Sequence, residues 1–328
     1  MKKIKIKFVD FFDGFDKEYN EFIDVLRKRY DVEISDNPDY IFYSGFGYEY
    51  LKYQCIRIFF TGECWVPNFN ECDYAIGFDR LQFGDRYARI PLYMLFQYKQ
   101  EFLGLIDRPL VSMELLKAKN GFCNFVYSNC FAQDMRTEIF EKLSQYKQVD
   151  SGGRYRNNIG GAVKDKHAFM QNYKFSIAFE NSSYNGYSTE KIVEAFAAGT
   201  IPIYYGDPLI GEDFNEESFI NCHKYGSLEE VIEKVKEIDA DDELWLKMMN
   251  VQPVKIAYQP LENFLYQIFD QPIGVAGRRS NSIPARGYEA MLRRHAFYET
   301  KIYKYYRKAL NQWNRFRTGT MLTSKRTK

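Results

Sequence analysis

Hydrophobic and polar positions in the first 118 residues follow two alternating periods. Residues 3–9 alternate between apolar and polar side chains, as in a strand with one buried face. The helical period follows in Tyr19, Phe22, Ile23, Leu26 and Tyr30, and short apolar runs come next at 40–43, 57–60, 73–78 and 89–93. Strands that alternate with helices predict a parallel sheet covered by helices.

A second series of the same kind starts near residue 122. Residues 122–128, 174–180 and 200–205 are predicted strands, and residues 189–198 form a predicted helix that Gly199 ends. Ser227 and Glu230 form a capping box ahead of another amphipathic helix. We therefore predict an α/β protein with two parallel-sheet domains, residues 1–118 and 119–270, and a helical, basic C-terminal tail, residues 271–328.

The bulk composition argues against several classes of protein. The 328-residue chain carries 45 Lys or Arg and 44 Asp or Glu, so its net charge of +1 gives no overall attraction to nucleic acid. No apolar run is long enough for a signal peptide or a membrane span, so we expect a cytoplasmic protein. The six cysteines form no C-x-x-C pair and are expected to be reduced thiols. An aromatic content of 18% suits surfaces on which sugar rings or bases stack.

The C-terminal residues 286–328 are strongly basic, with twelve Lys or Arg against two Glu. One interpretation is a pair of terminal helices that pack an aromatic face on the body and leave their charges in water. The other is a basic amphipathic segment that lies on the anionic inner face of the cytoplasmic membrane, which would make the protein peripheral. Nucleic-acid binding is the least favoured, because no recognisable reader module accompanies the charge.

A polar loop, residues 180–188, lies between a predicted strand and a predicted helix, where parallel sheets bind ligands. Ser188 or Thr189 can cap the helix, whose first-turn N–H groups favour an anion such as phosphate, and Lys191 adds a positive charge. Glu190 would repel phosphate, so we expect it to accept hydrogen bonds from sugar hydroxyls. The loop therefore suggests a nucleotide sugar, although ordinary solvated first-turn residues would show the same spacing.

Other phosphate-binding motifs are missing from the sequence. It contains no G-x-G-x-x-G and no G-K-[ST], which disfavours a dinucleotide-binding protein or a P-loop NTPase. The D-x-D triplet Asp239–Asp241 could hold a metal against a diphosphate, but it falls at the polar end of a predicted helix and is expected to be solvated. Lys and Arg side chains are then expected to neutralise a leaving diphosphate.

Three sequence blocks resemble one known family. The stretch FENSSYNGYSTEKIVEAFAAGTIPIYYGDP (179–208) resembles the signature of the α-1,3-fucosyltransferases of glycosyltransferase family 10. FFTGECWVPNFNECDYAIGFDRLQFGDRYARIPLY (59–93) looks like the N-terminal block of bacterial members, and SGGRYRNNIGGAVKDKHAFMQNYKF (151–175) also fits. Together the similarity spans most of residues 57–222.

The resemblance implies both a fold and a reaction. The fold is of the GT-B type, with two Rossmann-like domains whose parallel sheets face each other across a cleft, the first binding the acceptor and the second GDP-fucose. The reaction transfers L-fucose from GDP-fucose, with inversion, to O3 of the N-acetylglucosamine or glucose unit of an N-acetyllactosamine- or lactose-type acceptor, in the synthesis of a Lewis-type glycan, O-antigen or capsule. No metal or other cofactor is expected.

The resemblance also implies roles for individual residues. Glu63 would be the general base that takes the proton of the acceptor hydroxyl. Lys191 and Arg136 would neutralise the departing diphosphate. The implied contacts to the donor are Asn181, Ser182, Tyr187, Thr189 and Glu190, together with these two cations.

The sequence departs from the family pattern around the proposed base. Gly62, Glu63, Cys64 and Trp65 stand where bacterial relatives often read G-E-N, so the base is kept while its neighbours differ. Trp65 could stack on an acceptor sugar or fill core. N-acetylglucosamine and glucose both remain open as acceptors. The rival interpretations are a glycosyltransferase that uses another GDP-sugar and a non-catalytic GDP-sugar-binding protein.

Overall fold

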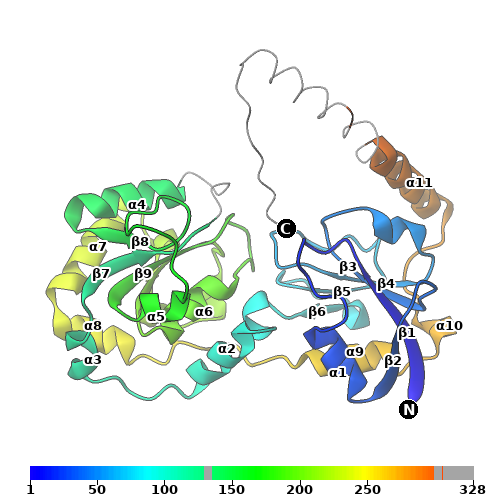
Figure 1. Cartoon of the computed structure of the whole chain (residues 1–328), viewed down its shortest axis with the longest axis horizontal. Coiled ribbons are helices and arrows are strands. Elements are labelled where there is room, and N and C mark those ends of the chain that lie inside the picture. Colours follow the sequence, from blue (N-terminus) through cyan, green and yellow to red (C-terminus); the bar gives the residue numbers. More distant parts are fainter. Residues whose placement is uncertain (129–134, 299–304, 306–328) are drawn as a thin grey trace.

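The computed structural model describes residues 1–128, 135–298 and 305, which form two α/β domains side by side (Figure 1). Each domain contains a parallel sheet with helices packed on its faces. This confirms the predicted α/β class and the two parallel sheets. Short 3-10 helices connect some elements, at Glu49–Lys52, Gly84–Arg86, Leu92–Met94, Ile210–Glu212, Glu216–Ser218 and Cys222–Lys224.

The sheet of the first domain has the strand order β2-β1-β3-β4-β5-β6. Its strands are β1 (Lys2–Val9), β2 (Tyr30–Ile34), β3 (Tyr40–Tyr43), β4 (Ile56–Phe60), β5 (Tyr74–Gly77) and β6 (Tyr87–Arg89). Every residue of β3, β4 and β5 is buried, which explains why these strands are short and, apart from Arg57 in β4, carry no charged side chain. The helix α1 (Glu21–Arg27) covers one face, where the ring of Phe22 lies 5.0 Å from that of Phe42.

The sheet of the second domain has the order β11-β10-β9-β7-β8. Its strands are β7 (Gly121–Phe125), β8 (Val149–Ser151), β9 (Tyr173–Phe179), β10 (Ile201–Tyr205) and β11 (Ile220–Asn221). The helices are α3 (Met113–Lys117), α4 (Met135–Tyr146), α5 (Lys166–Met170), α6 (Glu190–Ala197), α7 (Leu228–Ala240) and α8 (Asp242–Met249). Ser227 accepts a hydrogen bond from the Glu230 N–H at 3.3 Å, which confirms its predicted capping of α7.

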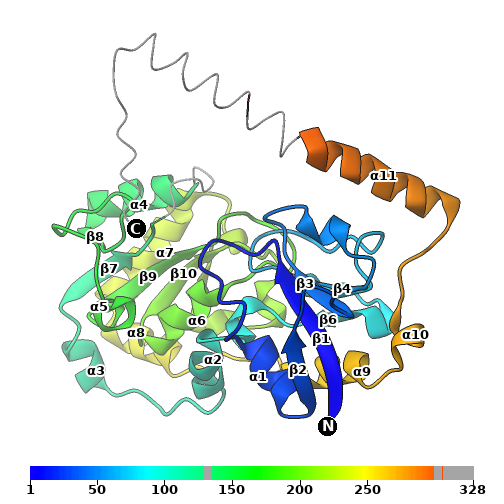
Figure 2. The ribbon, with the colours of Figure 1, turned by 45° about the vertical axis from the view of Figure 1, so that its right-hand side comes forward.

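The helix α9 (Leu261–Phe269) lies beside α1 on the first domain, as two views show (Figures 1 and 2). Lys2 donates to the carbonyl of Phe269 at 2.7 Å, and the Tyr30 hydroxyl to Asp270 at 2.6 Å. Residues 261–270 therefore do not lie with the second domain, to which the predicted boundaries assigned them. The periodicity of α9 indicates a buried face, but not which sheet covers it.

The chain after α9 continues along the first domain through α10 (Ile273–Ala276) and α11 (Ile283–Phe297). On α11, the Tyr288 hydroxyl is bonded to Asn68 at 2.7 Å, and Glu289 lies 3.4 Å from buried Arg57. Most of the basic segment 286–328 lies outside the described residues. No helix in the described ranges is long and apolar enough to cross a membrane.

Two arginines of the first domain hold acidic residues of the second. Arg80 binds Asp207 at 2.8 Å and Asp213 at 3.2 Å, and Arg89 binds Asp213 at 3.0 Å. Both aspartates are buried. Asp207 also accepts a hydrogen bond from the Gly186 N–H at 2.8 Å. The loop that precedes α6 is thereby tied to the contact between the domains.

The cysteines are reduced where the structure describes them. Cys55, Cys64, Cys72, Cys123 and Cys222 carry free thiols, as predicted. Burial raises the pKa of the Cys64 thiol to about 11, so this thiol is protonated at neutral pH. Cys130 lies outside the described residues.

Candidate active site

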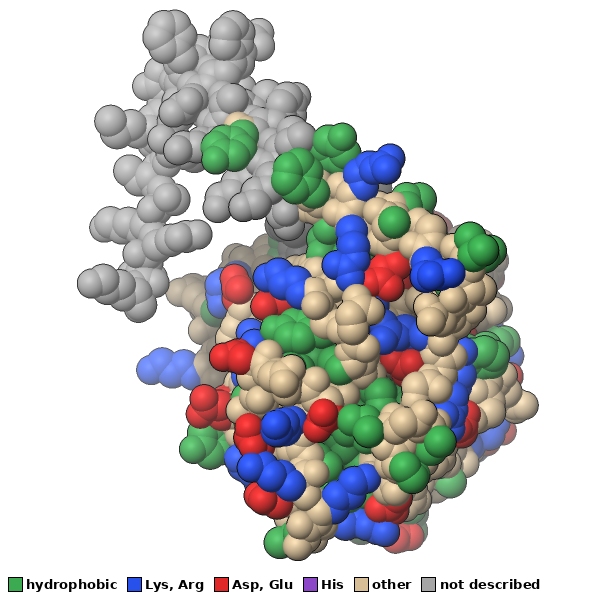
Figure 3. All heavy atoms as spheres, turned by 90° about the vertical axis from the view of Figure 1, so that its right-hand side faces the viewer, with side chains coloured by type: hydrophobic (Ala, Val, Ile, Leu, Met, Phe, Trp, Pro, Cys, Tyr) green, Lys and Arg blue, Asp and Glu red, His purple; other side chains and the backbone are tan. Residues whose placement is uncertain are grey.

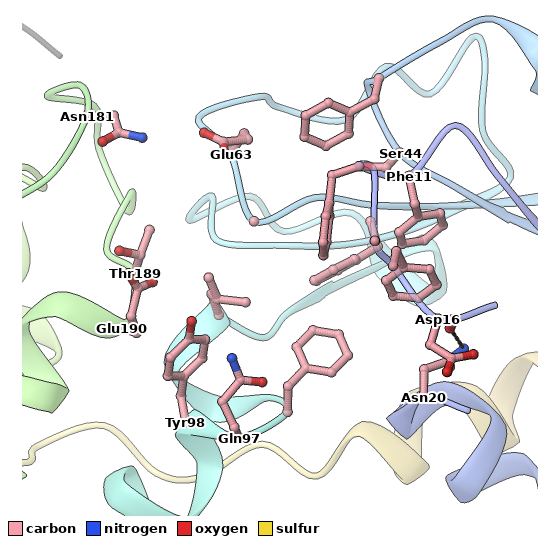
Figure 4. A pocket seen from close by; sticks show the side chains of 18 of the residues that line it. Phe11, Asp16, Asn20, Ser44, Glu63, Gln97, Tyr98, Asn181, Thr189 and Glu190 are labelled. Atoms are coloured by element: carbon pink, nitrogen blue, oxygen red, sulfur yellow. Dashed lines mark hydrogen bonds between the residues drawn. The ribbon is translucent and has the colours of Figure 1, made fainter. Parts of the chain in front are cut away.

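A cavity of about 430 Å³ lies between the domains, at the carboxyl ends of strands from both sheets (Figure 4). The first domain contributes Phe11 and Asp16 after β1, Ser44 after β3 and Glu63 after β4, together with Gln97 and Tyr98. The second domain contributes Asn181, Tyr187, Thr189, Glu190 and Lys191, from the loop after β9 and the first turn of α6. Loops that meet at this edge are the usual ligand site of such sheets.

The first turn of α6 is organised by Glu180, the residue directly after β9. Its buried carboxylate accepts hydrogen bonds from the Thr189 N–H and the Thr189 hydroxyl, both at 2.7 Å, and from the Lys191 ammonium at 2.8 Å. Thr189 occupies the N-cap position, but its side chain does not cap the helix. The predicted capping by Ser188 or Thr189 is therefore wrong, because the Thr189 side chain is bonded to Glu180 instead.

Lys191 and Glu190 are charged and lie close together. The Lys191 ammonium lies 3.6 Å from the Glu190 carboxylate. Burial lowers the pKa of Lys191, but Glu180 and Glu190 outweigh this effect and hold the pKa well above its ordinary value. Burial raises the pKa of Glu190, but Lys191 and Lys166 outweigh it and hold the pKa below its ordinary value. Lys191 carries the positive charge expected from the sequence, but two carboxylates surround that charge.

Arg136, near the start of α4, is 2% exposed and points at the same loop. One of its terminal nitrogens donates to the Asn181 side-chain oxygen at 2.8 Å and to the Phe179 carbonyl at 3.0 Å. Its guanidinium lies 4.1 Å from the centroid of the Tyr127 ring. Among the described residues, its Nε and its other terminal nitrogen have no hydrogen-bond partner. These two donors are available to an anion.

A smaller cavity of about 240 Å³ joins these groups within the second domain. Arg136, Lys166 and Lys191 line it together with Glu190 and Asn181. Lys166 begins α5 and forms an ion pair with Glu194 of α6. Three cations in one partly buried cavity suit a polyanionic ligand.

Glu63 stands on the opposite wall of the cleft cavity, on the loop after β4 (Figure 4). The Glu63 N–H donates to the Thr61 hydroxyl at 3.0 Å, which fixes the turn. Trp65 follows two residues later and is 41% exposed, so it does not fill core. Ser182 is partly buried and lines neither the cleft cavity nor the smaller cavity.

Sequence reasoning missed Glu180 and Lys166. The apolar pattern indicates Glu180 only as the end of a predicted strand, although an acidic residue after an apolar strand and eleven positions before a lysine is a usable signal. Lys166 offered no such signal, because it reaches the cavity from a separate helix, α5.

The D-x-D triplet is not a diphosphate site. Asp239 is buried and forms ion pairs with Lys147 and with Lys174, the latter at 3.2 Å, while Asp241 caps α8 by accepting from the Leu244 N–H. The prediction of a solvated helix end is wrong for Asp239, because these two lysines cover it. In the part of the chain that the structure describes, no group of three His, Cys, Asp or Glu side chains could hold a metal ion.

The fold and the cleft define a class, the two-domain GT-B glycosyltransferase architecture, and comparison with known proteins narrows it. Residues 6–96 match the family model described as "Alpha-(1,3)-fucosyltransferase FucT N-terminal domain". Residues 116–257 match "Glycosyltransferase family 10 (fucosyltransferase) C-term". The chain belongs to glycosyltransferase family 10, as the sequence resemblance predicted.

Individual relatives agree with the family models. An α-(1,3)-fucosyltransferase of Helicobacter pylori is 35% identical over 279 residues, which cover 73% of this chain and 58% of that protein. The human 4-galactosyl-N-acetylglucosaminide 3-alpha-L-fucosyltransferase 9 is 30% identical over 155 residues, 45% of this chain and 41% of that one. The chain thus spans little more than half the length of the bacterial relative.

A solved structure confirms the fold. The crystal structure of an α1,3-fucosyltransferase with GDP-fucose superposes with a TM-score of 0.69 at 30% identity, covering 86% of this chain and 93% of that one. A further crystal structure, described only as that of an α1,3-fucosyltransferase, gives a TM-score of 0.71 at 29% identity. The predicted GT-B arrangement of two Rossmann-like domains is confirmed.

Proposed function

We propose that this chain transfers L-fucose from GDP-fucose, with inversion, to O3 of an N-acetylglucosamine or glucose unit in an oligosaccharide. One observation carries the proposal: Glu63 of the first domain and the Glu190–Lys191 pair of the second line one cavity. A carboxylate facing an anion-binding loop across a cleft is what direct displacement between two bound substrates requires.

In the proposed reaction the acceptor oxygen attacks the anomeric carbon of fucose from the side of Glu63. Glu63 takes the hydroxyl proton, the new C–O bond forms, and the bond to the diphosphate breaks. Arg136, Lys166 and Lys191 neutralise the charge that develops on the leaving GDP. Because these cations can neutralise the charge that a divalent ion neutralises in other enzymes, we propose that the reaction needs no bound metal.

Glu190 is suited to the sugar rather than to the diphosphate. Its pKa is held below the ordinary value, so it is ionised at neutral pH and accepts hydrogen bonds from fucose hydroxyls. Asn181, Tyr187 and Thr189 line the same wall and complete the proposed donor site.

Incubation with GDP-fucose and N-acetyllactosamine or lactose, with a chelator present, tests this function. We expect release of GDP together with a fucosylated product whose new linkage is α-1,3. Absence of product across a broad panel of acceptors would contradict the proposal. Competition by GDP-mannose would identify the rival use of another GDP-sugar, and tight GDP-fucose binding without turnover would identify the non-catalytic rival.

We also propose that the protein is cytoplasmic and lies peripherally on the inner face of the cytoplasmic membrane. The support is α11, whose exposed side chains include Ile283, Met291 and Phe297 beside Arg293 and Arg294. The outer face of the first domain, in contrast, carries basic and acidic side chains interspersed (Figure 3). Cosedimentation with vesicles tests the proposal: the full chain should bind anionic vesicles and not neutral ones, and equal recovery with both would contradict it.

A further inference from the structure

A second cavity of about 430 Å³ opens on the first domain beside the cleft cavity. We call it the tryptophan pocket and define it by Tyr43, Tyr48, Trp65, Asn68, Glu71 and Tyr184. Ser44 lines both this pocket and the cleft cavity. The two cavities are therefore neighbours that share one wall residue.

Trp65 is fixed on one side and open on the other. A Cβ atom on Gly45 would lie 2.1 Å from the Trp65 ring, so the indole packs directly on the Gly45 backbone. The Phe46 ring meets it edge-on, with centroids 5.1 Å apart. Trp65 as a whole residue is nevertheless 41% exposed. A rigid, half-open aromatic face can bind an apolar ring face with little further loss of side-chain conformational entropy.

The pocket also has a fixed polar group. The Glu71 carboxylate accepts hydrogen bonds from Asn68 at 2.7 Å, from the Tyr288 hydroxyl at 3.2 Å and from the Tyr50 hydroxyl. A carboxylate has about four acceptor sites, so three protein donors leave Glu71 room for a ligand hydroxyl. An aromatic face and a carboxylate that line one pocket match a pyranose, which has an apolar face and a rim of hydroxyls.

The pocket lies one short turn away from the proposed base. Glu63 lines the cleft cavity, whereas Cys64 and Trp65 line the tryptophan pocket. Residues two positions apart are separated by at most about 7 Å along the chain. Tyr184 comes from the loop that precedes α6 and is 43% exposed, so the second domain also reaches this pocket.

We propose that the tryptophan pocket binds a second hexose of the acceptor, linked to the sugar whose hydroxyl faces Glu63. This hexose lies with its apolar face on Trp65, has Tyr184 at its edge, and donates hydroxyl hydrogen bonds to Glu71. The inference rests on the proposed function and deepens it, because it assigns the recognition of the second sugar of the acceptor to the residues of the tryptophan pocket.

The kinetic test compares N-acetyllactosamine with free N-acetylglucosamine as acceptors. The wild type should prefer the disaccharide, and Trp65→Ala should lower the ratio of the two kcat/KM values by roughly three- to tenfold. Tyr184→Ala should also lower this ratio, and Trp65→Phe should retain most of it. Phe83→Ala is the matched control, since Phe83 is 42% exposed on the same domain but does not line either cavity. An unchanged ratio in both alanine variants would overturn the proposal.

A binding measurement separates this inference from the proposed function. Lactose titrated into the GDP-loaded protein should change the tryptophan fluorescence of the wild type and leave that of Trp65→Phe unchanged. A Trp65-dependent signal without fucose transfer would support the pocket and contradict the function. Fucose transfer without that signal would support the function and overturn the pocket.

Discussion

At the scale of single residues, the cations of the donor wall differ in how free they are. Lys191 is held between Glu180 and Glu190, so a diphosphate must compete with two carboxylates for it. Arg136 keeps two buried donors that no described residue satisfies. A buried, rigid and unsatisfied guanidinium is preorganised for an anion. Arg136 is therefore expected to contribute more to the binding of GDP than Lys191 does.

Arg136→Ala should weaken GDP binding by roughly ten- to a hundredfold, because it removes charge-assisted hydrogen bonds. Isothermal titration calorimetry with GDP measures this loss, and Arg136→Lys should restore part of it. Arg156→Ala is the control, since Arg156 pairs with Glu141 on the surface of the same domain. Equal affinities of the Arg136→Ala and Arg156→Ala variants for GDP would refute the role of Arg136.

The sequence placed some residues of the site correctly and could not place others. Spacing put Glu190 and Lys191 on the first turn of a helix, where the structure has them. The ion pair between Lys191 and Glu180 could not be predicted, because it depends on how the loop between them folds back. Lys166 joins the site from α5 only through tertiary packing. Local pattern therefore determines which residues start an element, and packing determines which of them meet.

At the scale of elements, α6 connects the donor loop to a cluster of charges. Glu194 lies one turn beyond Glu190 and pairs with Lys166. Burial raises the pKa of Glu194 to about 7, although Lys166 lowers it in part, and Glu190 and Glu101 raise it further. The His167 ring also faces Glu101 at 3.6 Å. The protonation state of Glu194 on this helix thus changes close to neutral pH.

The raised pKa of Glu194 predicts a stability that decreases with pH. Between pH 4.5 and about 7 the folded protein keeps a proton that the unfolded chain has released, so the free energy of unfolding falls as pH rises in this window. The slope is at most about 1.4 kcal/mol per pH unit. Urea unfolding should show wild type losing stability relative to Glu194→Gln as pH rises. The raised pKa of Glu194 would be contradicted if the difference in free energy of unfolding between the two proteins did not change with pH, or if wild type gained stability relative to the variant as pH rises.

Helices and strands whose apolar positions follow a clear period were predicted well, and those whose apolar positions follow none were not. The predicted helix 189–198 is α6 (Glu190–Ala197), and the predicted strand 200–205 is β10 (Ile201–Tyr205). The apolar positions of residues 96–121 follow no regular period, yet this segment contains α2 (Tyr98–Ile106) and α3. In α2 the fully buried residues are Phe102 and Leu105, which is too few to mark a face.

At the scale of the whole molecule, the proposed activity depends on how the two domains are held. The pairing of Glu63 with the Glu190 wall follows from no local pattern, because the two lie 127 positions apart and on different sheets. The helix α2 packs against α6, and Arg80 and Arg89 bind Asp207 and Asp213 across the interface. These contacts position the donor loop relative to Glu63.

Arg80→Ala should loosen this arrangement, since it leaves buried Asp207 without its cation. We expect a loss of about 2 to 5 kcal/mol in the free energy of unfolding, and a larger radius of gyration by small-angle scattering. Lys3→Ala is the control, because Lys3 pairs with Glu33 on the surface of the first domain and should cost less than about 1 kcal/mol. If both variants behave alike, the contact between the domains does not depend on Arg80.

The Glu63→Gln substitution removes the proposed base and keeps the shape of the side chain, so it separates the chemistry from the binding of the donor. We predict that fucose transfer to lactose falls by at least about a hundredfold while calorimetric affinity for GDP-fucose stays within about twofold of wild type. Transfer at the wild-type rate, or loss of GDP-fucose binding in this variant, would contradict the assignment of Glu63 as the base that acts across the cleft.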